Sequence, residues 1–234
     1  MMPEHKAEFF AYALSQMPRE ACAVLAIVKG RERLFLCKNL AVAENQFIID
    51  PEDYRRAAEL GEIVGIVHSH VYQSSQPSQA DRVACEATGL EWFICSVPTG
   101  SWFSFAPDGF KAPLIGRQWA HGILDCYALV RDYYREKLGI QLMDFNREFE
   151  FWEKNQDIFC DDNLKMAGFT RIDPKDIREH DGVIIQIKAK VPNHSAVYLG
   201  NDQILHQLSK RLSSRDVYSG YYRKHTVKVV RYTG

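Results

Sequence analysis

The chain has 234 residues, of which 46% are apolar and 25% are charged, a balance typical of a soluble globular protein with one large domain or two small ones. Lysine and arginine number 29 against 30 aspartates and glutamates, so no net cationic field is available to hold a polyanion, and nucleic acid is not expected as a partner. The sequence has no apolar run of about 18 residues that would span a membrane, and its first residues lack the hydrophobic run and cleavage site of a signal peptide.

Apolar periodicity and turn residues predict an α/β unit in the first half of the chain. Helices are expected up to about Gln16, over residues 51–62 and over 78–89. Strands are expected over residues 22–28, 33–40, 63–70, 91–98 and 101–107. The turn-like segment 29–32 joins the first two strands as a hairpin, and Ser78 and Gly89 are the expected caps of the third helix.

The segment PDGFKAPLIG, with two prolines and two glycines, marks a domain boundary. We therefore expect domains at residues 1–107 and 118–234, joined by a linker at 108–117. The second domain is expected to be α+β, with its helices first. Its expected helices lie at 126–138, within 144–155 and within 161–169, and its expected strands at 182–190, 195–200, 203–208 and 225–233.

A first candidate site lies at the exit of the strand 63–70. His68 and His70 are two residues apart on that strand, so their side chains project from the same face and can reach one ion. Asp81, at the start of the next helix, supplies a third ligand if the loop returns that helix to the strand end. Two imidazoles and one carboxylate leave one position of a tetrahedral zinc ion open for water, as hydrolysis requires.

Hydrolysis at such a zinc ion also needs a carboxylate that carries a proton to the leaving amine. Glu20 is the candidate, because it lies at the edge of the first strand, where a neighbouring strand can hold it over the metal. The hydroxyl of Ser78 is a candidate donor to a developing oxyanion.

These residues resemble the JAMM (JAB1/MPN) metallopeptidases, whose signature is an upstream glutamate followed by H-x-H-x(7)-S-x-x-D. The resemblance implies a zinc peptidase or isopeptidase, with His68, His70 and Asp81 as metal ligands. It also implies that Glu20 is the general acid and base of the reaction. Many family members have a proline after the second histidine, where this chain has Val71. Two alternatives stay open, namely polar histidines at a sheet rim and a zinc site without catalysis.

A second candidate site begins at Cys126. This cysteine follows Asp125 at the start of an expected helix, where the positive end of the helix dipole favours a thiolate. The six cysteines form no C-x-x-C pair, and most of them are expected to be reduced, buried and small hydrophobic residues. Cys126 is therefore the expected nucleophile and the most reactive thiol.

His194 and His206 follow Cys126 in the order that a base and an orienting group require. A three-residue hairpin loop at 200–202 would place His206 opposite Ala196, on the same face as His194. A two-residue loop would put the two histidines on opposite faces. The basic residues that follow, Lys210, Arg211 and Arg215, are interpreted as a solvated face.

Cys126, His194 and His206 resemble the NlpC/P60 cysteine peptidases, which open a helix with Asp-Cys and carry a histidine and a third polar residue on adjacent strands. The resemblance implies cleavage of peptidoglycan stem or crosslink peptides by a Cys-His-His triad. The usual motif continues with Ser-Gly, whereas Tyr127 follows here and is expected to reshape the substrate entrance. His121 is a rival base by its proximity in sequence, interpreted instead as a loop residue.

The two modules in this order resemble the tail tip assembly proteins of lambda-type phages, on the stretches PREAC, IVHSH, HGILDCY and VPNH. The resemblance implies a bifunctional tail tip peptidase that acts in tail assembly or genome delivery, with zinc in its JAMM domain. It also implies contact with other tail tip proteins. The protein is then expected to be made in the host cytoplasm, to be located in the virion and to act at the host cell wall. Two alternatives are a structural tail tip plug with vestigial sites and a maturation protease of a tail protein.

Overall fold

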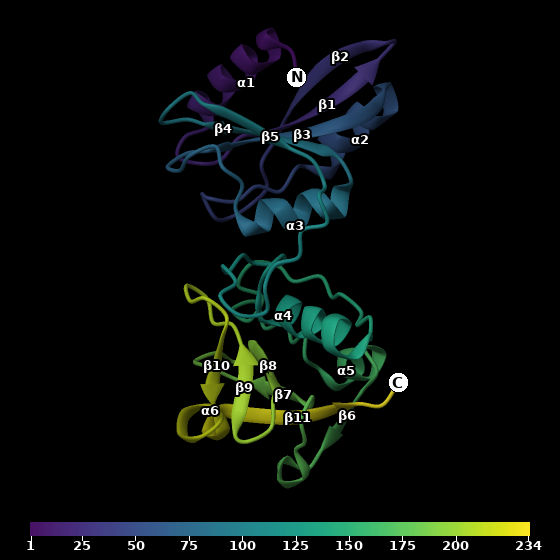
Figure 1. Ribbon diagram of the computed structural model, residues 1–234, viewed down its shortest axis with the longest axis vertical. Helices are drawn as coiled ribbons and strands as arrows, with labels where there is room; N and C mark the ends of the chain where they lie inside the picture. The colour runs from purple at the N-terminus through teal and green to yellow at the C-terminus, as the bar shows by residue number, and fades with distance from the viewer. The chain divides into compact units, whose positions relative to one another are not determined.

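The computed structural model describes residues 1–234, which form two compact units, Met1–Lys111 and Ala112–Gly234 (Figure 1). Each unit has its own sheet and its own hydrophobic core. No helix in either unit combines the length and the apolar character needed to cross a membrane.

The first unit is built on one five-stranded sheet with the order β2-β1-β3-β4-β5, in which only β3 and β4 run parallel. Its elements are α1 (Pro3–Gln16), β1 (Cys22–Val28), β2 (Arg31–Cys37), α2 (Pro51–Leu60), β3 (Glu62–His70), α3 (Gln79–Thr88), β4 (Glu91–Ser96) and β5 (Trp102–Phe105). All the helices and strands expected in this half are present. β2 begins earlier than expected because the turn needs only Lys29 and Gly30, both with positive φ, which lets Val28 pair with Arg31.

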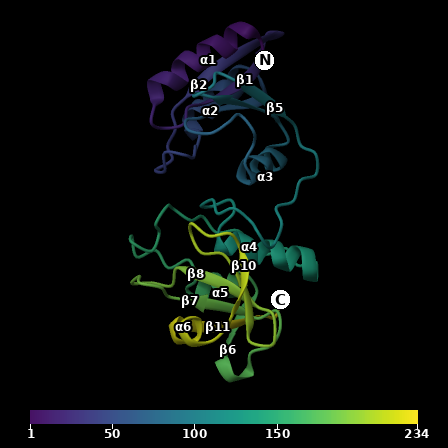
Figure 2. The ribbon, with the colours of Figure 1, turned by 60° about the vertical axis from the view of Figure 1, so that its left-hand side comes forward.

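Helices cover both faces of this sheet, as the views in Figures 1 and 2 agree. Along β1 the side chains alternate, so Ala23 and Leu25 pack with Phe9 of α1 on one face. Cys22 and Val24 pack with residues of α2 and α3 on the other face. The first unit is therefore a three-layer α/β/α arrangement, with the start of α3 near the end of β3.

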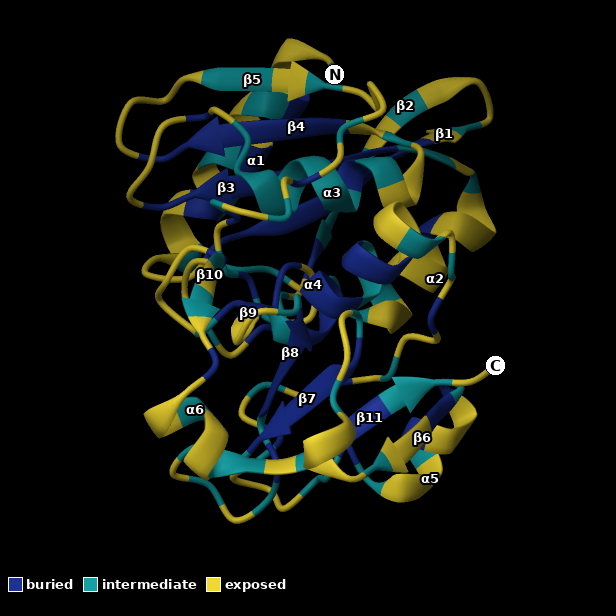
Figure 3. Cartoon of the chain, turned by 60° about the horizontal axis from the view of Figure 1, so that its bottom comes forward, coloured by how far each residue is buried: buried dark blue, intermediate teal, exposed yellow.

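The second unit contains a six-stranded antiparallel sheet with the order β10-β9-β8-β7-β11-β6. Its elements are α4 (Cys126–Tyr133), η1 (Tyr134–Leu138), α5 (Asp161–Met166), β6 (Phe169–Ile172), η2 (Pro174–Asp176), β7 (Gly182–Ile185), β8 (His194–Tyr198), β9 (Gln203–His206), β10 (Ser214–Val217), α6 (Gly220–His225) and β11 (Thr226–Tyr232). β7 and β8 are buried along their whole length (Figure 3). α4 and α5 pack on the sheet face that carries Val197 and Leu205.

The second unit departs from the expected elements in three places. No helix forms within residues 144–155, where Arg147 donates to the nearby carbonyl oxygen of Phe145 and to the distant one of Gly122. The strand expected over 182–190 stops at Ile185, because Asn193 donates to and accepts from the backbone of Ile187 and closes a loop. The sequence pattern did not predict β6, β10 or α6.

Candidate active sites

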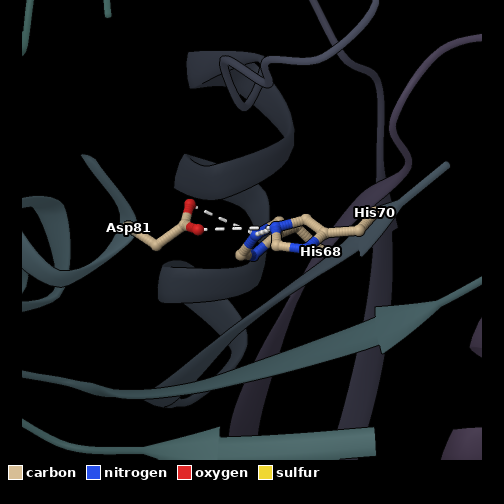
Figure 4. Close-up of side chains that lie close together, drawn as sticks. All are labelled: His68, His70 and Asp81. Carbon is tan, nitrogen blue, oxygen red and sulfur yellow. Dashed lines mark hydrogen bonds and ion pairs between the residues drawn. The ribbon is translucent and has the colours of Figure 1, made fainter. Parts of the chain in front are cut away.

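The end of β3 and the start of α3 bring His68, His70 and Asp81 together in the first unit (Figure 4). Nε2 of His68 lies 3.3 Å from Nε2 of His70 and 3.3 Å from Oδ1 of Asp81. Nε2 of His70 lies 3.4 Å from Oδ2 of Asp81. The three ligand atoms lie within 4.8 Å of one another, a spacing that allows them to surround one ion.

Neighbouring groups orient both imidazoles. Nδ1 of His70 lies 2.6 Å from the carbonyl oxygen of Ser74, so this nitrogen donates and Nε2 keeps its lone pair for a metal. The ring of His68 stacks on Phe47, with ring centroids 4.6 Å apart. Val71, which stands where many relatives of the JAMM type have proline, is buried, and the loop after it still returns Ser74 to His70.

Ser78 holds the Asp81 carboxylate in place by capping α3. The Ser78 hydroxyl accepts a hydrogen bond from the Asp81 N–H at 3.1 Å, and Oδ2 of Asp81 accepts one from the Ser78 N–H at 2.7 Å. The hydroxyl proton of Ser78 takes no part in this pair and is left to donate elsewhere. The expected caps of this helix, Ser78 and Gly89, are confirmed.

The charges at this site suit a divalent cation. Burial lowers the pKa of His68, which keeps this imidazole neutral as a metal ligand must be. Burial also acts to lower the pKa of His70, but the contact with Asp81 outweighs it and raises the value. Burial acts to raise the pKa of Asp81, yet the two histidines hold it well below its usual range. Two imidazole nitrogens and an ionised carboxylate are a donor set that fits zinc.

Glu20 lies beside this group. It is only 7% exposed and lies two residues before β1, and the register that sets Cys22 opposite His68 brings Glu20 level with His70. Burial raises the pKa of Glu20 to about 8, while His70 acts to lower it and Asp81 to raise it. A carboxyl with a pKa near neutrality can both accept and release a proton.

In the second unit, Cys126 is the first residue of α4 and Asp125 is its N-cap. The Asp125 carboxylate accepts hydrogen bonds from the N–H groups of Ala128 and Gly122, both at 2.9 Å. Nε of Arg147 forms a buried ion pair with the same carboxylate at 2.8 Å. These contacts fix the loop that presents Cys126.

The expected preference of Cys126 for a thiolate is wrong for the free protein. Burial raises the pKa of its thiol to about 11, and the charge of Asp125 adds to this effect, whereas Ser195 and Arg147 oppose it. Burial also lowers the pKa of His194 to about 3, with His206 acting in the same direction. Both shifts favour the neutral forms of the thiol and of the imidazole in the free protein, because burial outweighs the helix dipole.

The hairpin that carries the two histidines has the three-residue loop on which their shared face depends. Ala196 pairs with His206, and the Leu199 N–H donates to the carbonyl oxygen of Gln203 at 2.8 Å. The two histidines therefore share a face, and Nε2 of His194 lies 2.9 Å from Nδ1 of His206.

A residue that the sequence analysis did not single out continues this contact. Nε2 of His206 lies 3.0 Å from Oδ2 of Asp216 on β10, the strand that pairs Ser214 with His206. No local sequence signal indicated Asp216, because the residues of its strand β10, SRDV, have no apolar alternation.

Cys126 and His194 line one cleft of about 270 Å³ in the second unit. Its lining mixes polar and charged side chains with the aromatic and aliphatic residues Trp119, Phe151, Trp152, Ile158, Ile187 and Leu208. His121 also lines this cleft, but its Nε2 lies 3.0 Å from the carbonyl oxygen of Arg147. This contact directs the Nε2–H of His121 at the backbone and leaves the lone pair of a neutral ring on Nδ1.

Tyr127 does not reshape the entrance of this cleft, contrary to the expectation from its size. Its side chain is 5% exposed and belongs to the core beneath α4. Its hydroxyl donates to the carbonyl oxygen of Met143 at 2.6 Å. The residue after the nucleophile therefore fills the interior, because successive residues of a helix point in different directions.

The two halves match two families. Residues 2–108 match the model for prokaryotic homologs of the JAB domain, and residues 116–231 match the NlpC/P60 family. The fold and the two sites thus define a protein with a JAB domain followed by an NlpC/P60 domain, which confirms the expected fold class.

The chain belongs to the tail tip assembly protein K family of lambda-like phages. It is 39% identical over 224 residues to the tail tip assembly protein K of Escherichia phage N15, covering 95% of this chain and 91% of that protein. It is 33% identical over 184 residues to the protein of the same name from Escherichia phage lambda, covering 79% of this chain and 89% of that protein.

Two solved structures resemble the separate halves. A JAB1/MPN domain protein from Archaeoglobus fulgidus is 22% identical, with a TM-score of 0.30, covering 46% of this chain and 87% of that chain. The NlpC/p60 domain of the peptidoglycan hydrolase SagA is 16% identical, with a TM-score of 0.36, covering 50% of this chain and 89% of that chain.

Proposed function

We propose that this protein is a peptidase of the phage tail tip whose second unit cuts peptide bonds in peptidoglycan stems or crosslinks. Cys126 is the nucleophile, His194 the base and His206 the group that orients the base. The observation that carries the proposal is the 2.9 Å contact between Nε2 of His194 and Nδ1 of His206, at the cleft that Cys126 also lines. The match to the NlpC/P60 family supports the reaction, and the named phage relatives support a role at the tail tip.

In the proposed reaction, Sγ of Cys126 attacks the substrate carbonyl carbon while His194 takes the thiol proton. Because the thiol pKa is about 11 and the imidazole pKa about 3 in the free protein, we expect this proton to move only as the carbon–sulfur bond forms. The His194 imidazolium then gives the proton to the leaving amine. Water, with His194 again as the base, hydrolyses the thioester and restores the thiol.

We also propose that the first unit is a zinc-dependent peptidase or isopeptidase. His68, His70 and Asp81 would hold the ion, as their convergent ligand atoms support. A bound zinc ion lowers the pKa of a coordinated water to about 7 and polarises a carbonyl group. Glu20 would carry the proton to the leaving amine, and the free hydroxyl proton of Ser78 would stabilise the oxyanion.

Digestion of purified sacculi tests the role of the second unit. The full chain should release new amino groups from the stem peptides, and Cys126→Ala should release none. Cys160→Ala is the matched control, because Cys160 is the other partly exposed cysteine of this chain, and it should leave cleavage unchanged.

Two other outcomes would contradict the proposal. A protein that leaves sacculi intact but clips a co-expressed tail protein in a Cys126-dependent manner would be a maturation protease. A protein that cleaves neither substrate, and supports tail assembly equally well as Cys126→Ala, would be a structural tail tip plug.

A further inference from the structure

The Asp216 carboxylate accepts hydrogen bonds from four side chains. Its Oδ2 accepts hydrogen bonds from Nε2 of His206 at 3.0 Å, the Tyr222 hydroxyl at 3.0 Å and Nη1 of Arg211 at 3.3 Å. Its Oδ1 accepts from the Ser214 hydroxyl at 3.1 Å. Burial acts to raise the pKa of Asp216, but the bonds from His206 and Tyr222 outweigh it and lower the value to about 2. The group is therefore an ionised carboxylate near neutral pH and can only accept.

Two elements hold this carboxylate against His206. β10 pairs with β9 so that Ser214 lies opposite His206, and Asp216, two residues further, points to the same side of the sheet as Ser214. Tyr222 of α6 contacts both His206 and Asp216. Its hydroxyl donates to Asp216, and its ring lies edge-on to the His206 ring, with 4.8 Å between the ring centroids. The His206–Asp216 contact is thus fixed from a strand and from a helix.

An ionised acceptor at this position determines which nitrogen of each imidazole carries a proton. Nε2 of His206 must donate to Asp216, so a neutral His206 ring has its lone pair on Nδ1. That lone pair accepts from Nε2 of His194 at 2.9 Å. Nε2 of His194 therefore carries a proton, and a neutral His194 ring has its lone pair on Nδ1.

We propose that Asp216 is a positioning residue of the Cys126 site, which sets the tautomers of His206 and His194 and so makes Nδ1 of His194 the base. This inference rests on the function proposed for the second unit. When His194 takes the Cys126 proton, the carboxylate stabilises the positive charge through His206 without being protonated itself. Asp216 then acts as a fourth member of the site, after Cys126, His194 and His206.

Imidazole ¹⁵N chemical shifts of the full-length protein, labelled in histidine, report the tautomers directly. The wild type should show the proton on Nε2 in both His194 and His206. In Asp216→Asn, an amide that can also donate replaces an obligatory acceptor, so we expect His206 to populate the Nδ1–H form. Sacculus cleavage should lose on the order of 10²–10⁴-fold in kcat with little change in KM, because the base is disturbed and the cleft is not.

Two further variants separate positioning from folding. Asp216→Glu keeps a carboxylate and should restore part of the lost kcat together with the wild-type tautomers. Asp202→Asn is the matched control, since this exposed carboxylate pairs with Arg223 and should change neither readout.

The inference is overturned if wild-type His206 carries its neutral proton on Nδ1, a result that needs no variant. Unchanged tautomers together with unchanged kcat in Asp216→Asn would overturn it as well. A wild-type protein that cleaves no sacculi contradicts the proposed function instead, and the tautomers of the wild type and of Asp216→Asn then decide whether Asp216 sets them.

Discussion

Ser78 and Asp81 each bind the backbone N–H of the other at the start of α3, so the carboxylate proposed as a metal ligand is also part of a helix cap. Ser78→Ala should therefore weaken two properties together. We expect a loss of about 1 kcal/mol in the free energy of unfolding, typical of a lost N-cap, and a zinc affinity lower by roughly 10–100-fold, because the ligand is less well oriented. Ser78→Thr keeps the cap and should retain both. Urea denaturation and competitive zinc titration measure them, and an unchanged affinity in Ser78→Ala would contradict the positioning role.

Purified protein should bind about one zinc ion per chain, because two imidazoles and one carboxylate converge at a single point. His68→Ala should abolish this binding. His5→Gln is the control, since His5 is a buried histidine of the same unit that contacts Glu32 outside the site. Elemental analysis that finds no zinc, even after reconstitution, would show that the ligand assignment is wrong.

Glu20→Gln should keep zinc and lose any metal-dependent peptidase activity. Gln retains the size of the side chain but cannot accept and release a proton, which is the role that a buried carboxyl with a raised pKa is suited to. Zinc content and activity on an isopeptide substrate are measured on the same preparation. If the variant loses its zinc, Glu20 is a ligand or a structural residue and not a proton carrier.

Acid should destabilise the second unit partly through His194. Its pKa is about 3 in the folded protein, below the usual 6.5, so between these values the unfolded chain binds a proton that the folded chain does not. The free energy of unfolding therefore falls as the pH falls through this window, by at most about 1.4 kcal/mol per pH unit for one group. His194→Gln removes this proton uptake and should lose less stability between pH 6.5 and 4, measured by urea midpoints. A variant whose midpoints run parallel to those of wild type would refute the proton uptake.

The two chemistries should be independent, because each candidate site is completed within its own unit. A chelator should remove zinc and leave sacculus cleavage intact, whereas Cys126→Ala should end cleavage with zinc still bound. Loss of cleavage on chelation, with the second unit still folded by circular dichroism, would move the lytic role to the metal site.

The same independence predicts that a fragment of the second unit is active, and the structure indicates where it should begin. The buried side chain of Arg117 donates to the carbonyl oxygens of Ala112 at 3.0 Å and Pro113 at 3.1 Å. A fragment that starts at Ala112 keeps both acceptors. One that starts at Gly116 loses them and should be less stable by about 1–3 kcal/mol, measured by urea denaturation.

Local sequence signals were sufficient for much of the fold and for the convergence of residues at both sites. The strand that ends in His68 and His70, and the cap at Ser78, follow from period-two alternation and from the hydrogen-bonding habits of serine. The shared face of His194 and His206 followed from loop length alone, because one residue more or less reverses the parity of a hairpin.

Features that depend on contacts distant in sequence could not be predicted in this way. β10 carries Asp216 but is polar, so nothing in its own residues shows that it pairs with β9. Arg211, interpreted as part of a solvated face, donates to that same Asp216 carboxylate. The raised pKa of Cys126 depends on burial by the whole second unit, which the position of the residue at a helix start does not reveal.

The packing of Tyr127 has a consequence for engineering by consensus. A designer who aligned this chain with NlpC/P60 enzymes in general would be drawn to restore the common Asp-Cys-Ser motif by changing Tyr127 to serine. Here that change would empty a ring-sized space among Phe145, Phe159 and their neighbours, and would leave the Met143 carbonyl without its donor. Removal of a large buried aromatic side chain typically lowers the free energy of unfolding by about 3–5 kcal/mol, so serine, the common residue of the family, would destabilise this protein.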